Sequence, residues 1–78
     1  YGRLAGLLLR IMGRQGQAHK DGILLDLQLT RQEMANMIGT SRETVARILS
    51  RFQKEGIIRL AKQQILVLDE EKLREWTD

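Results

Sequence analysis

The sequence predicts an α+β fold that is mainly α-helical and carries a small β-sheet, and three observations predict it. Two amphipathic helix patterns follow one another between residues 31 and 55, separated by one glycine and two hydroxyl residues. An alternating apolar segment precedes them, and two short apolar runs follow them. Apolar residues recurring at intervals of three and four indicate a helix, whereas strict alternation indicates a half-buried strand.

Length and composition fit one small domain. The 78 residues are 42% hydrophobic, which favours a folded globule, and no apolar run approaches the length of a membrane span. We therefore expect a soluble, cytoplasmic protein without a membrane partner. The chain has no cysteine, which excludes disulfides and thiolate metal sites. His19 is the single histidine, and it is interpreted as a solvated loop residue rather than a metal ligand.

Basic charge is concentrated in the body of the chain. The formal net charge is +3, but residues 69 to 78 carry five acidic side chains against two basic ones, so the preceding part is more basic than the total suggests. A basic body suits a polyanionic partner, because neutralised phosphates release their counterions. A solvated surface is the alternative interpretation for most of these lysines and arginines.

The first third of the chain is expected to form a helix, a loop and a strand. Apolar residues at helical spacing predict an amphipathic helix over residues 3 to 13. Residues 14 to 22 are polar, contain two glycines and show no periodicity, so they are expected to form a loop. Residues 23 to 29 alternate with a period of two, which predicts a half-buried strand that leads into the next helix.

The first of the two paired helices is expected over residues 31 to 38. Thr30 and Glu33 have the spacing of a capping box, which satisfies free amides at a helix start. Gly39 should end this helix, because a residue without a Cβ readily adopts the left-handed conformation. Its apolar positions are expected to be Met34, Met37 and Ile38, with the small Ala35 beside them.

The second helix, residues 42 to 55, has an apolar face and a charged face. Thr40 and Ser41 both offer a cap for it, and its apolar stripe is Val45, Ile48, Leu49 and Phe52. Arg42, Glu43 and Arg47 fall within an arc of about 140° that lies away from this stripe. Arginine can pair with O6 and N7 of guanine, and glutamate can accept from N4 of cytosine. Near the N-terminus of a helix in the major groove, these three side chains would read bases.

Other interpretations of these side chains remain open. A charged helix face is often only solvated, and Glu43 could complete a capping box with Thr40 or pair with Arg47 four residues on. Ser41 and Thr44 could donate their hydroxyls to flanking phosphates, which fixes register without carrying sequence information.

Residues 57 to 68 are predicted to form a β-hairpin after Gly56. Two short apolar runs, residues 57 to 60 and 65 to 68, are separated by AKQQ. This turn contains no glycine, asparagine or aspartate to accept a positive φ, so a looser four-residue turn is expected in place of a two-residue one. Lys62 at its tip could reach a phosphate, with a solvated lysine as the alternative. A helix-turn-helix with a strand before it and such a hairpin after it is a winged helix-turn-helix.

A short helix is expected at the end of the chain. Asp69, Glu70 and Glu71 favour a helix start, and Leu73 and Trp76 share one face. Trp76 is expected to pack against the protein rather than to stack on a base, because its acidic neighbours repel nucleic acid.

Residues 29 to 49, LTRQEMANMIGTSRETVARIL, resemble the DNA-binding domain of the Crp/Fnr family of transcription regulators. The TRQE and SRETV runs are the specific parts, and the likeness is much weaker outside residues 29 to 58. The resemblance implies that Arg42 and Arg47 bind guanines and that Glu43 binds a cytosine, in a half-site of the TGTGA type. It places phosphates near Gln32, Ser41 and Thr44.

The resemblance also implies an organisation for the chain. Residues 1 to 78 would be one DNA-binding domain, with the helix-turn-helix at 30 to 56 and the wing at 57 to 68, from a homodimer that binds a palindromic operator. Because Tyr1 stands in place of methionine and no secretory leader follows, we expect an excised piece without the sensor domain and the dimerisation helix. No cofactor is expected in this domain, and the effector of the sensor domain is unspecified. Residues 14 to 22 become a candidate contact for RNA polymerase.

Catalysis is not expected from this chain. It contains no Ser, His and Asp set at usable positions and no P-loop or dinucleotide fingerprint. The main alternative function is a winged helix that binds a protein, but such a helix should expose aromatic or aliphatic anchors. Sequence-neutral DNA binding is disfavoured by Glu43, because a carboxylate facing phosphates is unfavourable unless it accepts from a base amine.

Overall fold

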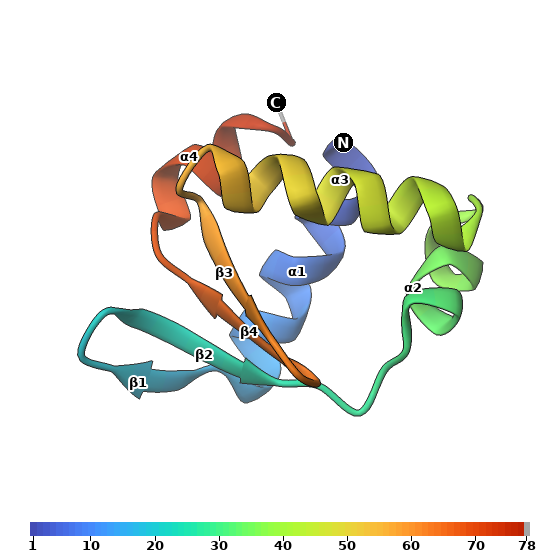
Figure 1. The fold of residues 1–78 in the computed structure, drawn as a ribbon. Helices are drawn as coiled ribbons and strands as arrows, with labels where there is room; N and C mark the ends of the chain where they lie inside the picture. Colours follow the sequence, from blue (N-terminus) through green and yellow to red (C-terminus); the bar gives the residue numbers. More distant parts are fainter. Residues whose placement is uncertain (78) are drawn as a thin grey trace.

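The computed structural model describes residues 1 to 77, and within them four helices surround one face and one end of a four-stranded antiparallel sheet (Figure 1). This confirms the predicted α+β fold of a winged helix-turn-helix. In chain order the elements are α1 (Gly2–Gln15), β1 (Gln17–His19), β2 (Gly22–Asp26), α2 (Arg31–Ile38), α3 (Arg42–Lys54), β3 (Ile58–Ala61), β4 (Gln64–Val67) and α4 (Glu70–Glu75).

The strands are ordered β1-β2-β4-β3, so the wing hairpin β3–β4 continues the sheet that β2 begins. β2 pairs with β4 from Ile23 opposite Val67 to Asp26 opposite Gln64. Gly22 allows this close approach, since a Cβ on it would lie 2.0 Å from the carbonyl oxygen of Val67. A strand was predicted over residues 23 to 29. β2 ends earlier, at Asp26, although Leu27 beyond its end is buried.

The expectation of a loop over residues 14 to 22 is wrong. Residues 14 and 15 belong to α1, and Gln17 to His19 form β1, which pairs with β2. All three residues of β1 are exposed, so the strand has no buried face and leaves no apolar alternation in the sequence. Its pairing depends on backbone hydrogen bonds to β2, which side-chain patterns do not report.

The α2–α3 corner has the predicted local structure. Thr30 and Glu33 form both hydrogen bonds of the capping box, at 3.0 and 2.9 Å. Gly39 ends α2 in the left-handed region with φ 74°. Met37, however, was predicted to share the apolar face and is 55% exposed. At 100° per residue it lies about 110° from the centre of the face that α2 turns inward, which Met34, Ala35 and Ile38 form.

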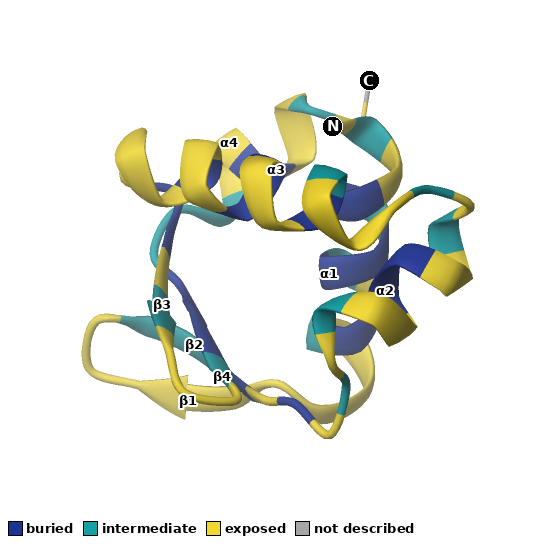
Figure 2. Ribbon diagram, turned by 45° about the vertical axis from the view of Figure 1, so that its right-hand side comes forward, coloured by how far each residue is buried: buried dark blue, intermediate teal, exposed yellow. Residues whose placement is uncertain are grey.

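The core lies where α1, α3 and the sheet meet (Figure 2). The predicted apolar stripe of α3 is buried here, and Phe52 is its largest fully buried side chain. α1 contributes Leu4, Leu7 and Leu8 from the opposite side, and Leu73 closes the core from α4. Burial of these side chains holds one face of α3 against the domain and leaves its other face outside.

An aromatic cluster joins the two ends of the described chain. The ring of Trp76 stacks on that of Tyr1 at 4.8 Å, and Phe52 lies 5.7 Å from Trp76. α4 is present as predicted, with the Asp69 side chain accepting a hydrogen bond from the Lys72 amide. The prediction that Trp76 packs against the protein is confirmed.

The expected four-residue turn at the wing tip is wrong. Ala61 pairs with Gln64, so the turn has only two residues, Lys62 and Gln63, and Gln63 adopts φ 59°. A left-handed non-glycine residue costs about 1 to 2 kcal/mol. The Leu27 amide donates a hydrogen bond of 2.9 Å to the carbonyl oxygen of Gln63, which fixes this conformation from a segment remote in sequence.

Candidate nucleic-acid interface

The N-terminus of α3 is capped by Ser41, which settles one open alternative. The Ser41 hydroxyl oxygen accepts a hydrogen bond from the Thr44 amide at 3.1 Å, so Ser41 and not Thr40 is the cap. Ser41 also donates to the Thr44 hydroxyl oxygen at 2.9 Å. A hydroxyl that accepts this bond keeps its own hydrogen. Thr44 can therefore still donate to an acceptor in front of the helix start, where the helix dipole also favours a negative group.

The three predicted base-reading residues lie together on the first two turns of α3. The Arg42 and Glu43 side chains are 64% and 79% exposed, and Arg47 is exposed one turn further along. Arg42 Nε lies 4.0 Å from Glu43 Oε1. An ion pair this long between two exposed side chains is weak, so both can turn to an outside partner. The sequence offered Thr40 and Arg47 as partners of Glu43. In the structure Glu43 pairs with neither of them and lies near Arg42 instead.

Two small residues on the same face escaped the sequence prediction. Ala46 and Ser50 are exposed between the charged side chains of α3. Small side chains at these positions let the helix backbone approach a surface closely, so that arginine and glutamate can reach past it. The signal was available in the sequence, because both residues fall inside the polar arc of the helix.

The predicted phosphate contacts come from three different elements. Gln32 is exposed on α2 and donates through Nε2 to Asn36 Oδ1 at 2.9 Å, which leaves its second amide hydrogen for another acceptor. Ser41 and Thr44 lie at the start of α3. Lys62 is exposed at the wing tip, at the far end of the sheet from α3 (Figure 1). The structure therefore groups six of the seven predicted residues near the α2–α3 corner and places Lys62 apart from them.

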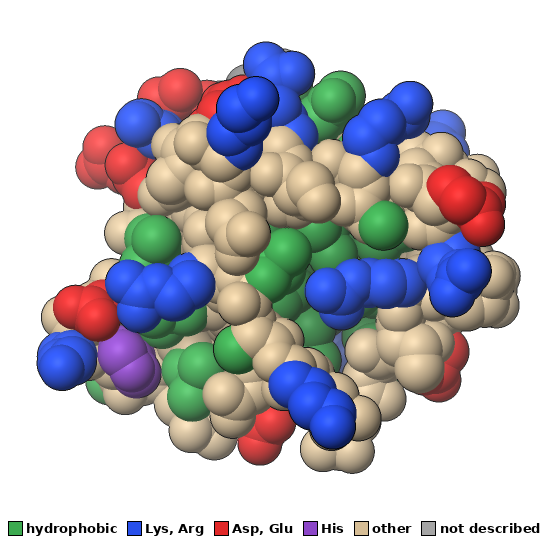
Figure 3. All heavy atoms as spheres, viewed as in Figure 1, with side chains coloured by type: hydrophobic (Ala, Val, Ile, Leu, Met, Phe, Trp, Pro, Cys, Tyr) green, Lys and Arg blue, Asp and Glu red, His purple; other side chains and the backbone are tan. Residues whose placement is uncertain are grey.

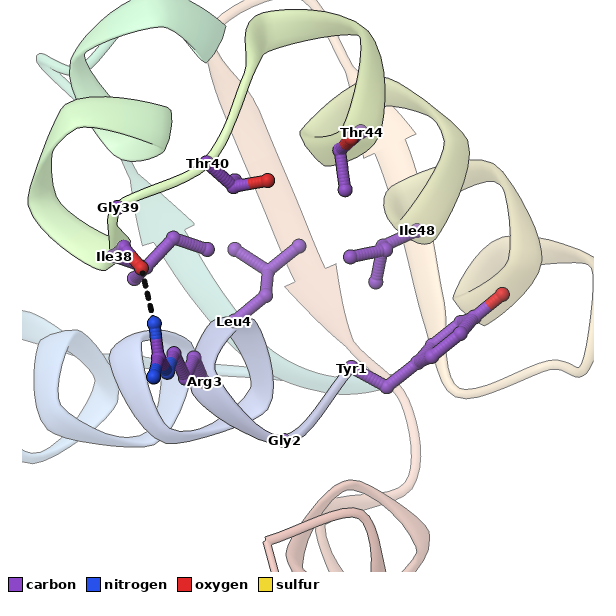
Figure 4. Close-up of a pocket in the computed structure, with 9 residues that line it drawn as sticks. All are labelled: Tyr1, Gly2, Arg3, Leu4, Ile38, Gly39, Thr40, Thr44 and Ile48. Carbon is purple, nitrogen blue, oxygen red and sulfur yellow. Dashed lines mark hydrogen bonds between the residues drawn. The ribbon is translucent and has the colours of Figure 1, made fainter.

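A pocket of about 380 Å³ lies behind the corner, between it and the start of α1 (Figure 4). Leu4, Ile38 and Ile48 point toward one another inside it. Arg3 Nη1 donates a hydrogen bond of 3.2 Å to the carbonyl oxygen of Ile38, one of the last carbonyls of α2. This bond joins α1 to the end of α2 and satisfies a carbonyl that lacks a partner within the helix.

Charge on the molecule is unevenly placed. Lys and Arg side chains are spread over α3 and toward the wing tip, whereas acidic side chains gather beside α4 (Figure 3). Near the end of α3, a hydrogen bond from Arg51 to Glu55 raises the pKa of the arginine, and Arg51 also lies over the Tyr1 ring at 5.9 Å. Arg51 thus already interacts with Glu55 and Tyr1 and is less available to an outside partner than Arg42 and Arg47.

The described residues contain no candidate for two other kinds of site. Over residues 1 to 77, no three histidine or acidic side chains come together as ligands of a metal ion would. Within the same range, none of the helices has the length and hydrophobicity that a membrane crossing requires.

An exposed charged helix face, anchored through its other face and accompanied by a β-hairpin, defines a winged helix-turn-helix domain of the DNA-binding class. The model of the Crp-like helix-turn-helix domain matches residues 2 to 76. The chain therefore belongs to the Crp-like helix-turn-helix family, as residues 29 to 49 predicted.

Several transcription regulators are similar to this chain. The CRP-like cAMP-activated global transcriptional regulator of Mycobacterium tuberculosis is 38% identical over 72 residues, which cover 92% of this chain and 32% of that protein. The anaerobic regulatory protein of Bacillus subtilis is 33% identical over 67 residues, covering 86% and 28%. The CO-dependent transcription factor CooA of Carboxydothermus hydrogenoformans matches with a TM-score of 0.91 at 37% identity, covering 97% and 36%. The chain spans about a third of the length of such relatives.

Proposed function

We propose that this chain is the DNA-binding domain of a bacterial transcription regulator and that it reads sequence by inserting α3 into the major groove. The observation that carries the proposal is the pair of faces on α3. Its inner stripe is buried in the core, while Arg42, Glu43 and Arg47 are exposed together at its N-terminal end. A helix held in this way can enter a groove of about 12 Å without rearranging the domain.

The three side chains have complementary roles in the proposal. Arg42 and Arg47 each bind a guanine through O6 and N7, and Glu43 accepts from the N4 amine of a cytosine. A half-site of the TGTGA type supplies these groups. Phosphate contacts from Gln32, Thr44 and Lys62 hold the register of α3 on the duplex, and Ser41 joins them when its hydroxyl turns from Thr44 to a phosphate.

Further features of the proposal concern the protein as a whole. The domain comprises residues 1 to 78, with the helix-turn-helix at 30 to 56 and the wing at 57 to 68. It acts in the cytoplasm within a homodimer on a palindromic operator, with half-sites about one helical turn apart. Residues 14 to 22, which include the exposed strand β1, are the proposed contact for RNA polymerase.

The alternative of a protein-docking winged helix receives little support from the exposed surface. Within residues 1 to 77, the large hydrophobic side chains that are exposed are Tyr1 and Met37, and neither belongs to α3. Aromatic or aliphatic anchors, which such an interface would need, are therefore missing from the exposed face of this helix.

Selection of bound sequences from a random DNA pool tests the proposal directly. The 78-residue chain at moderate salt is expected to enrich a half-site with guanines and a cytosine at fixed positions. A paired, inverted arrangement of that half-site would support the palindromic operator. Retention of the pool without enrichment of any sequence would reject base readout and leave only electrostatic binding.

A further inference from the structure

We propose that Gln53 is a positioning residue that ties the wing to α3 and so sets where Lys62 meets the DNA backbone. Gln53 lies in the last turn of α3, and its Oε1 accepts a hydrogen bond of 2.7 Å from the Leu60 amide in β3. A side chain of the proposed recognition helix is therefore bonded directly to the backbone of the wing. This role rests on the proposed function of α3 and deepens it.

The Leu60 amide points away from its own sheet. β3 is the edge strand in the order β1-β2-β4-β3, and it pairs with β4 alone. In an antiparallel pair, residues alternate between those that exchange hydrogen bonds and those whose N–H and C=O groups turn outward. Since the amide of Leu60 donates to Gln53, its pair with Ile65 is of the second kind. Gln53 thus accepts a hydrogen bond from a backbone amide that has no partner within the sheet, at the edge next to α3.

The wing tip is held at a second point. The Leu27 amide donates to the carbonyl oxygen of Gln63 at 2.9 Å, so the turn is fastened to the segment that leads into α2. Lys62 lies between the two attachments, two residues after Leu60 and one before Gln63. The first attachment comes from α3 itself, and the second comes from the segment just before α2. The backbone of Lys62 is consequently held in place relative to the helix that carries Arg42 and Arg47.

This tie acts on binding more than on folding. Gln53 is exposed and Leu60 only half-buried, so water can replace the glutamine once its side chain is removed. The fold should therefore survive. A loosened hairpin, however, loses conformational freedom when Lys62 engages a phosphate, and that loss weakens the contact. Without the tie, the wing contributes less to affinity for any DNA sequence.

Three variants of the 78-residue chain separate these effects. Gln53→Met keeps the length of the side chain and removes the acceptor, whereas Gln53→Glu keeps an acceptor at the same reach. Gln15→Met makes the same chemical change at an exposed glutamine at the end of α1. Hydrogen exchange of the Leu60 amide should be faster in Gln53→Met by roughly 2- to 10-fold, unchanged in Gln15→Met, and no faster than in the parent chain in Gln53→Glu, because a carboxylate is the stronger acceptor. Equal exchange rates in Gln53→Met and the parent chain would overturn the tie.

The DNA measurement uses the salt dependence of affinity with and without Lys62. Lys62→Ala should reduce the slope of log affinity against log salt by about 1. Gln53→Met should reduce it by a part of that amount, and should have no further effect in the Lys62→Ala background. If the parent chain binds no DNA, the proposed function is rejected. The exchange rates then still test whether Gln53 binds the Leu60 amide. Normal binding with an unchanged slope in Gln53→Met or in Lys62→Ala would reject the positioning role alone.

Discussion

The inner and outer faces of α3 belong to the same helix but are held by different interactions. Val45, Ile48, Leu49 and Phe52 on the inner face are at most 4% exposed and touch α1 and the sheet. Arg42 and Glu43 on the outer face are 64% and 79% exposed and share one long ion pair. The domain uses the first face to fix the helix and leaves the second for a partner. Stability and recognition should therefore respond to separate substitutions.

The largest effect is expected from the inner face. Phe52→Ala removes the largest fully buried side chain and should lower the free energy of unfolding by about 3 to 5 kcal/mol, because a cavity remains. Urea denaturation followed by circular dichroism measures this change. Arg47→Ala, five residues earlier on the other face, is the matched control. A loss below about 1 kcal/mol in Phe52→Ala would show that the inner face does not anchor the helix.

Substitution on the outer face should give the reverse result. Arg42→Ala is expected to leave the free energy of unfolding within about 0.5 kcal/mol of the parent value, because its side chain supports no buried contact. Its affinity for the selected operator should fall by about 1 to 3 kcal/mol, with relaxed preference at one base pair. Fluorescence anisotropy on the operator and its single-base variants provides the measurement. An equal fall on scrambled DNA would assign Arg42 to the phosphates.

Lys62 sharpens the comparison because it is exposed like the outer face but lies on another element. Lys62→Ala should weaken binding to the selected operator and to scrambled DNA by the same factor, and should reduce the salt slope by about 1. Titrations at several salt concentrations on both duplexes measure the two quantities. A change in base preference would mean that the wing takes part in sequence readout.

The smallest effect is expected at the wing turn, where neither face of α3 contributes. Gln63→Gly relieves a left-handed non-glycine residue, which costs about 1 to 2 kcal/mol, but loosens the unfolded chain by about 0.5 to 1 kcal/mol. A net gain in stability of about 0 to 1.5 kcal/mol should appear as a higher thermal midpoint. If the variant is less stable than the parent chain, the Gln63 side chain itself must support the turn.

The sequence predicted the parts of the fold that local residues determine. The capping box of Thr30 and Glu33, the left-handed Gly39 and the buried stripe of α3 all depend on spacing within about ten residues, and each prediction is confirmed. The family was also predictable, because TRQE and SRETV lie together in one segment. The roles of Arg42, Glu43 and Arg47 in base readout stay predictions, supported by their exposure on a single helix face.

What the sequence did not predict leaves no trace in the apolar pattern of its own segment. β1 forms because the backbone of β2 lies beside it, with no buried face to mark it. Gln63 accepts a positive φ because the Leu27 amide binds its carbonyl oxygen. Met37 is exposed because the short α2 turns only part of its apolar arc inward. Only the Gln63 case depends on a remote segment, but in all three cases the side-chain pattern of the segment alone does not contain the deciding feature.

A double-mutant cycle between protein and DNA tests the central claim most directly. It combines Arg47→Ala with replacement of the guanine that Arg47 is proposed to bind in the selected half-site, and affinity is measured for all four combinations. The two changes should be coupled by about 1 to 3 kcal/mol, since each removes the same bidentate contact. Losses that add to within about 0.5 kcal/mol would show that Arg47 does not read that base and would contradict recognition through the outer face of α3.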